Sequence, residues 1–349
     1  MQKLSFDEEP NPSQVLHSLA VYSKNRDSDK YMSGEIFDEL HNNLREVLGV
    51  EDALYLPSGK MAQMIAMKLH TSQRRCSRIA VHPRSHMEEY EARAYSELWG
   101  LSAVQLGGYD RLPTAEDLDN IKEKLGAVVI ELPMRKLGCL LPSWDQLCAI
   151  SDTARERNIP LHLDGARLWE SQPFYDRPYA EIVSIFDSVY VSFDKGLGCL
   201  AGGALVGTSK LVDEAKIWQR RAGGRSLRSF PTILSALQGL EERLPLMAEF
   251  HEKAKDLATV MGKFSGVSVA PRLPHANAFF VTFQGNRARA YRMRDRVASE
   301  TGLRLFEELV DCVDQSMIRF EVTIRGAGLI VTDDNVIESF KRFLEYCSE

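Results

Sequence analysis

The chain lacks the features that would mark a membrane, secreted or nucleic-acid-binding protein. No run approaches the roughly 18 apolar residues of a membrane span, and the N-terminus has neither the basic start nor the apolar stretch of a secretory signal. The six cysteines show no CxxC or metal-ligand spacing, which favours free thiols and no metal site. A formal net charge of −6 without a basic patch argues against nucleic acid or an anionic membrane as a partner. We expect a cytoplasmic protein.

Glycine signatures and repeats are missing as well. No Gly-x-Gly-x-x-Gly follows an early strand, so the sequence gives no support for a nicotinamide site. No internal repeat, low-complexity tract or flexible linker interrupts the 349 residues. Hydrophobic residues make up 44% of the chain and charged residues 26%, as in ordinary globular proteins. A chain of this length exceeds the size at which one core usually stops growing, so we expect a large domain and a smaller one.

Short apolar segments alternate with helical segments through the first two thirds of the chain. Apolar residues recur at helical spacing in stretches such as 36–49, 59–70 and 143–158. The short apolar segments are 52–59, 77–83, 101–106, 126–133, 159–164, 188–193 and 202–208. This order predicts a mostly parallel sheet covered by helices. After about residue 235 the pattern changes to long helical stretches and mixed segments, so we predict a large domain over 1–235 and a small one over 236–349.

Two of the apolar segments end in residues that suit pyridoxal phosphate (PLP). Asp164 ends one segment, and Lys195 follows another with Gly-Leu-Gly behind it. PLP is an electron sink only while its pyridine nitrogen stays protonated, which requires a buried carboxylate, and a lysine must hold its aldehyde as an imine. Open α/β sheets place ligands at strand ends. Either residue alone is commonly a turn or surface residue, so the combination indicates PLP chemistry.

The motifs around these two residues resemble a known family. HLDGARLWE (162–170) and SFDKGLG (192–198) are similar to the threonine aldolase branch of the PLP-dependent aminotransferase superfamily, which includes β-eliminating lyases. The family pattern is His-x-Asp-Gly-Ala-Arg-Leu, then Ser-x-Ser-Lys-Gly-Leu-Gly. The likeness extends roughly from Tyr31 to Phe340, and the chain is a divergent member. It implies a type I aminotransferase fold, with a large, mostly parallel seven-stranded sheet domain and a small α+β C-terminal domain.

The resemblance assigns a role to each residue of the two motifs. It makes Asp164 the partner of the pyridinium nitrogen and Lys195 the lysine that binds PLP. Arg167 corresponds to an arginine shared between the phosphate and the substrate carboxylate. Asp194 stands where the family has a serine before the lysine.

The turn PSGK before the helical stretch 59–70 is a second candidate region. A helix N-terminus presents unpaired N–H groups and binds phosphate well, although Ser-Gly before a helix is more often only a cap. The family places Ser/Thr-Gly-Thr here as the phosphate cup, so the match assigns this role to Ser58, Gly59 and Lys60. Lys60 replaces the threonine, and we favour a contact through its backbone N–H over its ammonium. Gln63 also departs from the family, which has an asparagine.

A histidine in VHPRSHMEEYEA (81–92) is the candidate that stacks on the cofactor. The family has a histidine here, ahead of Glu-Ala, whose ring lies over the PLP ring and presents a titratable group to the substrate. Glu91 and Ala92 favour His86 for this role, and His82 is close enough to compete. We expect His162 to pack beneath the cofactor.

Two arginines complete the candidate site by the same resemblance. Arg319 matches a small-domain strand where the family keeps an arginine that binds the amino-acid carboxylate by a bidentate contact. Arg228 resembles an arginine of a Gly-Gly-x-x-Arg-Gln loop that reaches the phosphate from a neighbouring subunit, although basic loops are mostly solvated surface. With that role for Arg228, we expect a homodimer or homotetramer with active sites at the subunit interface.

One departure from the family concerns the substrate. Threonine aldolases carry Glu-Asn-Thr-His after the strand that reads VVIELPM here, so Leu132, Pro133 and Met134 stand where polar residues are usual. The family histidine helps to handle the β-hydroxyl of the substrate. Without it the hydroxyl proton needs another acceptor, with His86 or a water as the nearest candidates. An apolar Met134 beside the substrate would favour aromatic β-hydroxy amino acids over threonine.

Three hypotheses for the function stay open. The first is a lyase resembling low-specificity L-threonine aldolase, which cleaves a β-hydroxy-α-amino acid to glycine and an aldehyde, or forms it from them. The second is another PLP reaction on an amino acid, such as β-elimination or racemisation. The third is a non-catalytic partner protein of the same fold, against which the presence of Lys195, Asp164 and Arg167 argues. The sequence does not decide the substrate side chain, the stereochemistry or the oligomer size.

Overall fold

The chain divides into two compact units. A computed structural model describes residues 1–7, 11–312 and 314–348. The large unit comprises Pro12–Leu137 and Leu141–Pro245, and the small unit comprises Met1–Asn11, Gly138–Leu140 and Leu246–Glu349.

These units differ in detail from the predicted domains 1–235 and 236–349. Residue 235 lies inside helix α11 (Phe230–Glu242), which is one hydrogen-bonded element and so does not divide there. The N-terminal strand β1 (Gln2–Lys3) pairs with β11 (Leu303–Arg304), and this pairing joins the start of the chain to the small unit. Both differences arise from contacts that composition along the chain does not reveal.

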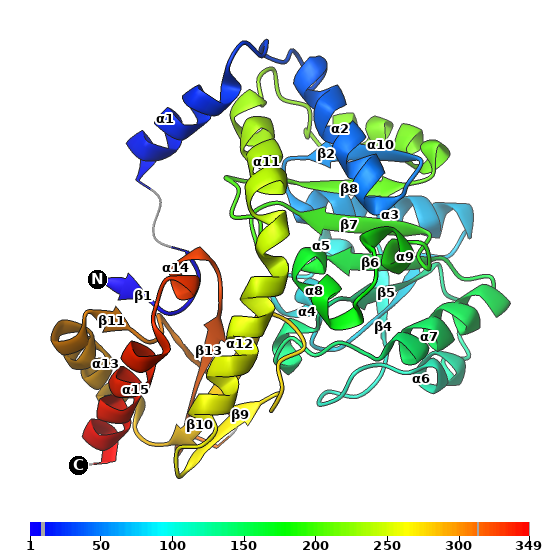
Figure 1. Ribbon diagram of the computed structural model, residues 1–349. Helices are drawn as coiled ribbons and strands as arrows, with labels where there is room; N and C mark the ends of the chain where they lie inside the picture. Colours follow the sequence, from blue (N-terminus) through cyan, green and yellow to red (C-terminus); the bar gives the residue numbers. More distant parts are fainter. Residues whose placement is uncertain (8–10, 313, 349) are drawn as a thin grey trace. The chain divides into compact units, whose positions relative to one another are not determined.

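A seven-stranded sheet forms the centre of the described large unit (Figure 1). Its strand order is β2 (Asp52–Leu56), β8 (Gly203–Gly207), β7 (Ser188–Ser192), β6 (Leu161–Gly165), β5 (Ala127–Glu131), β3 (Arg78–Val81) and β4 (Ser102–Gln105). Strand β8 is antiparallel to both of its neighbours, and the other six strands point the same way. The expected mostly parallel sheet is confirmed, and each of its strands lies within one of the short apolar segments, except that β6 extends one residue beyond its segment.

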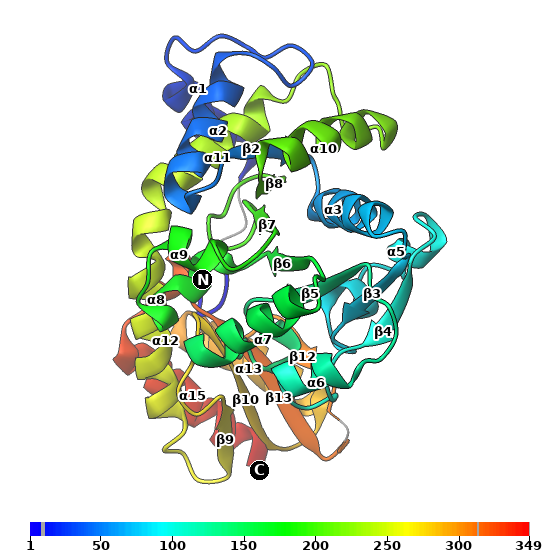
Figure 2. The same ribbon diagram turned by 90° about the vertical axis from the view of Figure 1, so that its right-hand side faces the viewer.

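Helices cover both faces of this sheet. Figure 2 shows α3 (Gly59–Gln73) and α10 (Ser209–Arg221) on one side of the strands, and α7 (Trp144–Glu156), α8 (Leu168–Tyr175) and α9 (Tyr179–Val183) on the other. The remaining helices of this unit are α1 (Pro12–Ser23), α2 (Glu35–Leu48), α4 (His86–Glu89), α5 (Ala94–Glu97) and α6 (Ala115–Asn120), besides α11. None of the helices in the described parts of the chain is long and apolar enough to cross a bilayer.

Local sequence signals set the ends of the helices that matter for the site. Helix α3 begins after Ser58, whose Oγ accepts a hydrogen bond from the backbone N–H of Met61 at 3.4 Å, as an N-cap does. Its inner face then buries apolar side chains such as Ile65, which is 0% exposed, against Val129 and Leu205 of the sheet. Each fully buried side chain of this size contributes about 1.5–3 kcal/mol. Burial therefore holds the N-terminus of α3 against the sheet.

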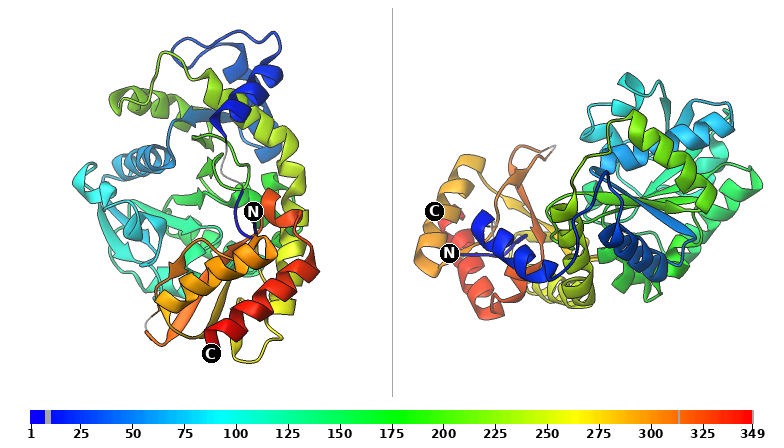
Figure 3. Two further views of the ribbon diagram at one scale, coloured as in Figure 1. Left: turned by 90° about the vertical axis from the view of Figure 1, so that its left-hand side faces the viewer. Right: turned by 90° about the horizontal axis from the view of Figure 1, so that it is seen from above.

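The small unit contains a second sheet, of the antiparallel type. Its order is β12 (Leu309–Val310), β13 (Met317–Thr323), β10 (Ala278–Gln284) and β9 (Val267–Ala270). The helices of this unit are α12 (Met247–Met261), α13 (Arg287–Thr301), α14 (Gly326–Leu329) and α15 (Asp333–Ser348), with α13 in orange and α15 in red side by side in Figure 3. Aromatic side chains fill its core: the rings of Phe306 and Phe320 stack at 4.6 Å between centroids. This is the expected small α+β domain.

Candidate active site

A cavity of about 340 Å³ lies in the large unit at the carboxyl ends of the parallel strands. Its wall includes Ser58 after β2, His86 after β3, Glu131 at the end of β5, Asp164 in β6 and Lys195 after β7. Because parallel strands end at one edge of a sheet, their terminal residues meet there although they are far apart in sequence.

Asp164 is a buried carboxylate on the wall of this cavity. It is 2% exposed, accepts hydrogen bonds from Gln63 Nε2 at 2.8 Å and from the Ala166 backbone N–H at 3.2 Å, and forms no ion pair within the described residues. Burial raises the pKa of Asp164 above its ordinary value. A cation in the cavity would offset the free-energy cost of burying the Asp164 charge. Gln63, which departs from the family asparagine, is the side chain that orients the carboxylate.

Lys195 reaches the same cavity from the turn after β7. Its Nζ lies 2.9 Å from Oδ2 of Asp194. Burial acts to raise the pKa of Asp194, but hydrogen bonds from Ser192 and Lys195 outweigh it and the net shift is downward. Gly196 is needed beside the lysine because a Cβ there would come within 2.6 Å of the Glu170 carboxyl carbon. Asp194, in place of the family serine, holds the amine of Lys195 at the cavity wall.

The opening of helix α3 forms the anion-binding end of the cavity. Gly59 allows close packing here, since a Cβ at this position would lie 1.9 Å from the Tyr190 hydroxyl. Lys60 and Arg167 also line the cavity, and neither side chain has an ion-pair or hydrogen-bond partner among the described residues. Unpaired N–H groups at a helix N-terminus and two available cations together favour a phosphate.

These residues fit PLP. The cavity offers a buried carboxylate without a cation for the pyridine nitrogen, a primary amine for the aldehyde, and an anion-binding helix end for the phosphate. Asp164, Lys195 and the Ser58–Lys60 turn are thus the residues that would hold the three ends of the cofactor.

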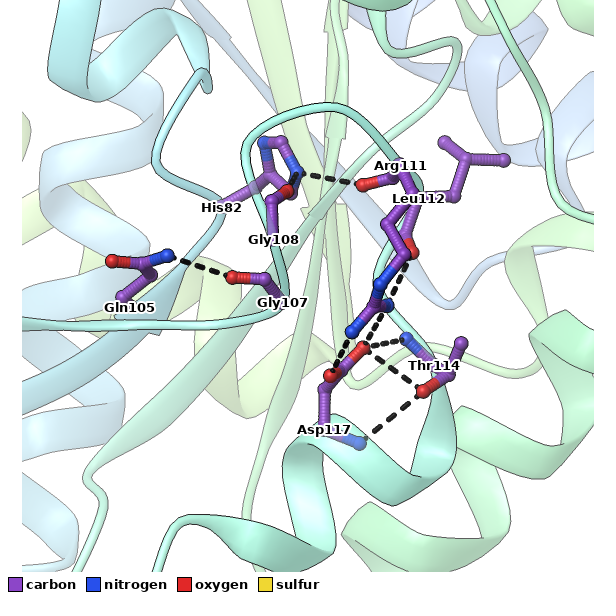
Figure 4. A network of polar contacts seen from close by, with 8 residues as sticks. All are labelled: His82, Gln105, Gly107, Gly108, Arg111, Leu112, Thr114 and Asp117. Carbon is purple, nitrogen blue, oxygen red and sulfur yellow. Dashed lines mark hydrogen bonds and ion pairs between the residues drawn. The ribbon is translucent and has the colours of Figure 1, made fainter.

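The structure separates the two candidate histidines. His82 is 2% exposed, and its Nε2 donates to the backbone carbonyls of Gly108 at 2.8 Å and Arg111 at 3.0 Å (Figure 4). Its Nδ1 accepts from the Arg84 backbone N–H at 3.1 Å. Both nitrogens are therefore occupied, and His82 fixes a loop that Arg111 and Asp117 tie further (Figure 4). Only His86 of the two lines the cavity.

His86 is bound on several sides. Its Nδ1 donates to Oε1 of the buried Glu91 at 2.8 Å, and its backbone N–H donates to Glu131 Oε2 at 2.9 Å. The Tyr90 ring stacks on the imidazole at 5.3 Å between centroids. The hydrogen bond to Glu91 raises the pKa of His86 despite the opposing effect of burial. Burial, followed by the charge of Asp164, raises the pKa of Glu131 to about 7.

The segment after β5 corrects one expectation from the sequence. Leu132, Pro133 and Met134 are buried and none of them lines the cavity, so Met134 does not face a substrate there. The chain turns into the short 3₁₀ helix η1 (Arg135–Leu137), and this turn directs the three apolar residues inward. Arg135 and Lys136 line the cavity instead.

Two contacts hold the Lys136 side chain in place on this wall. Its Nζ lies 2.8 Å from Glu89 Oε2 and 4.5 Å from the centroid of the Tyr90 ring. The wall expected to be apolar is thus charged and aromatic.

Three predicted residues are not among those that line this cavity. Arg228 donates from Nη1 to the Asp29 carbonyl at 2.6 Å and does not line the cavity, so its contribution to a neighbouring subunit stays a prediction. Arg319 belongs to β13 of the small unit, where its Nε donates to Thr282 Oγ1 at 3.1 Å, and its carboxylate-binding role also stays a prediction. His162 is fully buried and bonds to Ser188 Oγ at 2.7 Å.

Besides Tyr90, Arg135 and Lys136, two strand residues of the cavity escaped the sequence reasoning. Glu131 and Tyr190 lie in register with Asp164 on the neighbouring strands β5 and β7. Glu131 is the one charged residue of the apolar segment 126–133 and the last residue of β5, so a strand-end argument could have found it. Tyr190 lies inside its apolar segment, and no local signal distinguishes it from a core residue.

Comparison with known proteins decides the family. The model of the beta-eliminating lyase family matches residues 16–285. This chain belongs to the beta-eliminating lyase family. Low-specificity L-threonine aldolase 1 of Arabidopsis thaliana is 27% identical over 279 residues, which cover 76% of this chain and 77% of the relative.

Two solved structures are similar over the whole chain. A Listeria monocytogenes EGD-E protein assigned as an L-allo-threonine aldolase is 36% identical, with a TM-score of 0.95 over 99% of this chain and 96% of its own. An Exiguobacterium sp. 255-15 protein assigned as an aromatic amino acid beta-eliminating lyase/threonine aldolase is 33% identical, with a TM-score of 0.94 over 99% and 97%. The predicted family, fold and cofactor are confirmed: the chain is a PLP-dependent lyase of the threonine aldolase type.

Proposed function

We propose that the enzyme cleaves a β-hydroxy-α-amino acid to glycine and an aldehyde, or joins the two in reverse. The observation that carries this proposal is the presence of Lys195, Asp164 and His86 on the wall of one cavity. An amine, a carboxylate for the cofactor nitrogen and a titratable ring on the substrate side are the groups that aldol cleavage needs. The relatives named above as threonine aldolases support the same reaction.

Each residue has a distinct task in this reaction. When bound, PLP supplies the ring that accepts electrons from Cα of the substrate. Asp164 holds a proton at the pyridine nitrogen, because a buried carboxylate binds a cation strongly. Lys195 Nζ, held by Asp194, moves a proton at Cα. Arg167 binds carboxylate or phosphate oxygens, and His86 faces the β-hydroxyl.

The oligomer, the small-unit arginine and the location belong to the proposal as well. We place Arg319 on the substrate carboxylate and Arg228 on the phosphate of a neighbouring subunit, in a cytoplasmic homodimer or homotetramer. Light scattering of the purified protein tests the assembly. An Arg228→Ala variant that binds PLP as tightly as the unchanged enzyme would remove Arg228 from the site.

A second candidate is β-elimination, supported by the assignment of the Exiguobacterium relative. It needs proton removal from Cα and a leaving group at Cβ, but no acceptor for a hydroxyl proton. The cavity wall beside His86 carries Arg135 and Lys136, so it gives no particular preference for an apolar side chain.

Product analysis separates the candidates. PLP-loaded enzyme is incubated with L-threonine, L-allo-threonine, phenylserine and glycine, and aldehyde release and deuterium exchange at glycine Cα are followed by NMR. The proposal expects glycine exchange and cleavage of at least one β-hydroxy amino acid. Because Met134 is buried away from the cavity, the reason to expect slow threonine cleavage no longer holds. Exchange without any cleavage, together with keto-acid release from a substrate bearing a β-leaving group, would establish β-elimination.

A further inference from the structure

We propose that Glu91 is a positioning residue that makes His86 Nε2 the acceptor for the proton of the substrate's β-hydroxyl. Together the two side chains take the place of the histidine that the family carries after β5. This inference rests on the proposed cleavage of a β-hydroxy-α-amino acid.

The geometry of the pair defines which nitrogen is available. Glu91 Oε1 lies 2.8 Å from His86 Nδ1, and the Glu91 side chain is 1% exposed whereas that of His86 is 40% exposed. A carboxylate only accepts hydrogen bonds, so Nδ1 carries the hydrogen and Nε2 keeps its lone pair in the neutral ring. Within the described residues Nε2 has no partner, and the ring lines the cavity.

The Glu91 carboxylate has its one side-chain hydrogen bond, among the described residues, with His86. Its other oxygen, Oε2, is buried and has no hydrogen-bond partner among the described residues. A buried carboxylate with one partner gains its only direct hydrogen bond from the His86 ring, so the pair resists rotation of the imidazole. The Tyr90 ring covers one face of the imidazole and restricts it further.

Three other side chains are less suited to accept this proton. Both oxygens of Glu131 accept backbone N–H groups, from His86 at 2.9 Å and from Arg135 at 3.3 Å. His82 does not line the cavity: its Nε2 donates to the Gly108 carbonyl (Figure 4), and its Nδ1 accepts from the Arg84 backbone N–H. Met134, at the position of the family histidine, is buried and cannot titrate. Of these groups, only His86 combines a place on the cavity wall with a ring nitrogen that has no hydrogen-bond partner among the described residues.

The charges around His86 favour protonation of its ring. Glu91 contacts it from the segment after α4, Glu131 from the end of β5, and Asp164 from β6, and all three carboxylates stabilise an imidazolium. The cations Arg135 and Lys136 lie on the same wall and oppose this effect. Lys136 is paired with Glu89 on α4, which reduces its influence.

The proposed step balances in atoms and charge. The hydroxyl proton passes to His86 Nε2, the O–H electron pair becomes the second bond of the aldehyde C=O, and the Cα–Cβ bond breaks with its electron pair left on Cα. Delivery of one proton to Cα then gives glycine. His86 returns its proton during the reverse condensation or to water.

Two variants and a direct measurement test this inference on the PLP-loaded enzyme. Histidine is labelled with ¹³C and ¹⁵N, and the tautomer and titration of His86 are followed by NMR in the unchanged enzyme, in Glu91→Gln and in Glu97→Gln. Glu97 is an exposed glutamate on α5 and serves as the matched control. We expect the Nδ1–H tautomer and a His86 titration that moves to lower pH in Glu91→Gln only.

Kinetics provide the second readout. In Glu91→Gln we expect the ascending limb of kcat against pH to move to lower pH with His86, and kcat on the plateau to fall about tenfold or more, because a weaker base accepts the proton less readily. His86→Ala should lose about 10²-fold or more. If Glu91→Gln does not fold, Glu91→Asp is measured in its place. Because aspartate keeps a carboxylate, the ascending limb of its kcat against pH should stay at the pH of the unchanged enzyme.

The outcomes distinguish this inference from the proposed function. An Nε2–H tautomer, or a titration of His86 that Glu91→Gln leaves unmoved, overturns the role of Glu91 even when cleavage is normal. A His86 titration as expected, in an enzyme that cleaves no β-hydroxy amino acid, overturns the proposed function and with it the proton transfer.

Discussion

The two walls of the cavity are built differently. On the cofactor side, Asp164 and Lys195 follow strands and Ser58 opens a helix, so regular elements fix their positions. On the hydroxyl side, the wall is formed by the short helix α4, the segment leading to Glu91, and η1. Regular elements fix which residue of a motif reaches the cavity. In irregular segments, a change of sequence can place a different residue at the cavity. In this family member the cofactor wall keeps the aspartate and lysine of the family motifs, whereas the hydroxyl wall lacks the family histidine after β5.

The largest effect is expected on the cofactor wall. Lys195→Ala should remove the covalent, borohydride-reducible link between PLP and the protein together with all cleavage activity, because the variant lacks the amine that Asp194 holds at the cavity wall. Mass spectrometry after borohydride reduction measures the link. Lys210→Ala, at an exposed position of α10, is the control and should keep it. A persisting adduct in Lys195→Ala would place the link on another lysine.

Asp164→Asn should be next in size. The variant keeps the hydrogen bond from Gln63 but lacks the charge that holds a proton on the pyridine nitrogen. Each ~1.4 kcal/mol lost at the transition state costs about tenfold in rate, so we expect kcat to fall by about 10²-fold or more while PLP remains bound. Absorbance of the bound cofactor and steady-state kinetics measure both effects. Turnover equal to that of the exposed control Asp145→Asn would contradict this role.

Stability should respond to pH through three histidines of the large unit. Burial lowers the pKa of His70 and His41 to about 4 and that of His162 to about 3. Below pH ~6.5 the unfolded chain gains protons that the folded chain does not, so stability is fully present above that pH and falls as the pH drops to about 4, by up to ~1.4 kcal/mol per pH unit and histidine.

Urea unfolding between pH 4 and pH 8 measures this slope. His70→Gln should reduce it, because one of the three groups no longer titrates. A free energy of unfolding that stays constant from pH 6.5 to pH 4 would contradict the burial of these rings.

The smallest effect is expected at Met134, and it tests whether the segment after β5 belongs to the hydroxyl wall. If Met134 faced the substrate, Met134→His would restore the family histidine and accelerate threonine cleavage. Because Met134 is 1% exposed and outside the cavity, we expect no acceleration and a loss of about 1–3 kcal/mol from burying a polar ring. Met134→Leu conserves the volume and is the control, with a loss below about 1.5 kcal/mol. Faster threonine cleavage in Met134→His would show that this segment contacts the substrate after all.

Strand-end motifs were sufficient to predict the sheet and the cofactor wall. Asp164 and Lys195 could be placed because apolar segments end at them and parallel strands end at one edge. The choice between His82 and His86 depended on a weak match, and the structure supports it through contacts that link His82 to Gly108 and Arg111, more than twenty residues away. The domain boundary at 235 could not be placed, because helix α11 continues through it.

What the sequence by itself determined was the type of fold, the cofactor and the residues that we propose for its pyridine nitrogen and aldehyde. These features depend on short segments whose periodicity and strand-end residues are local properties of the chain. Only the tertiary structure decided which way Met134 points, and that Glu91 and Glu131 converge on His86. Those positions depend on burial and on hydrogen bonds between distant segments, such as the one from the His86 backbone to Glu131, which no local pattern encodes.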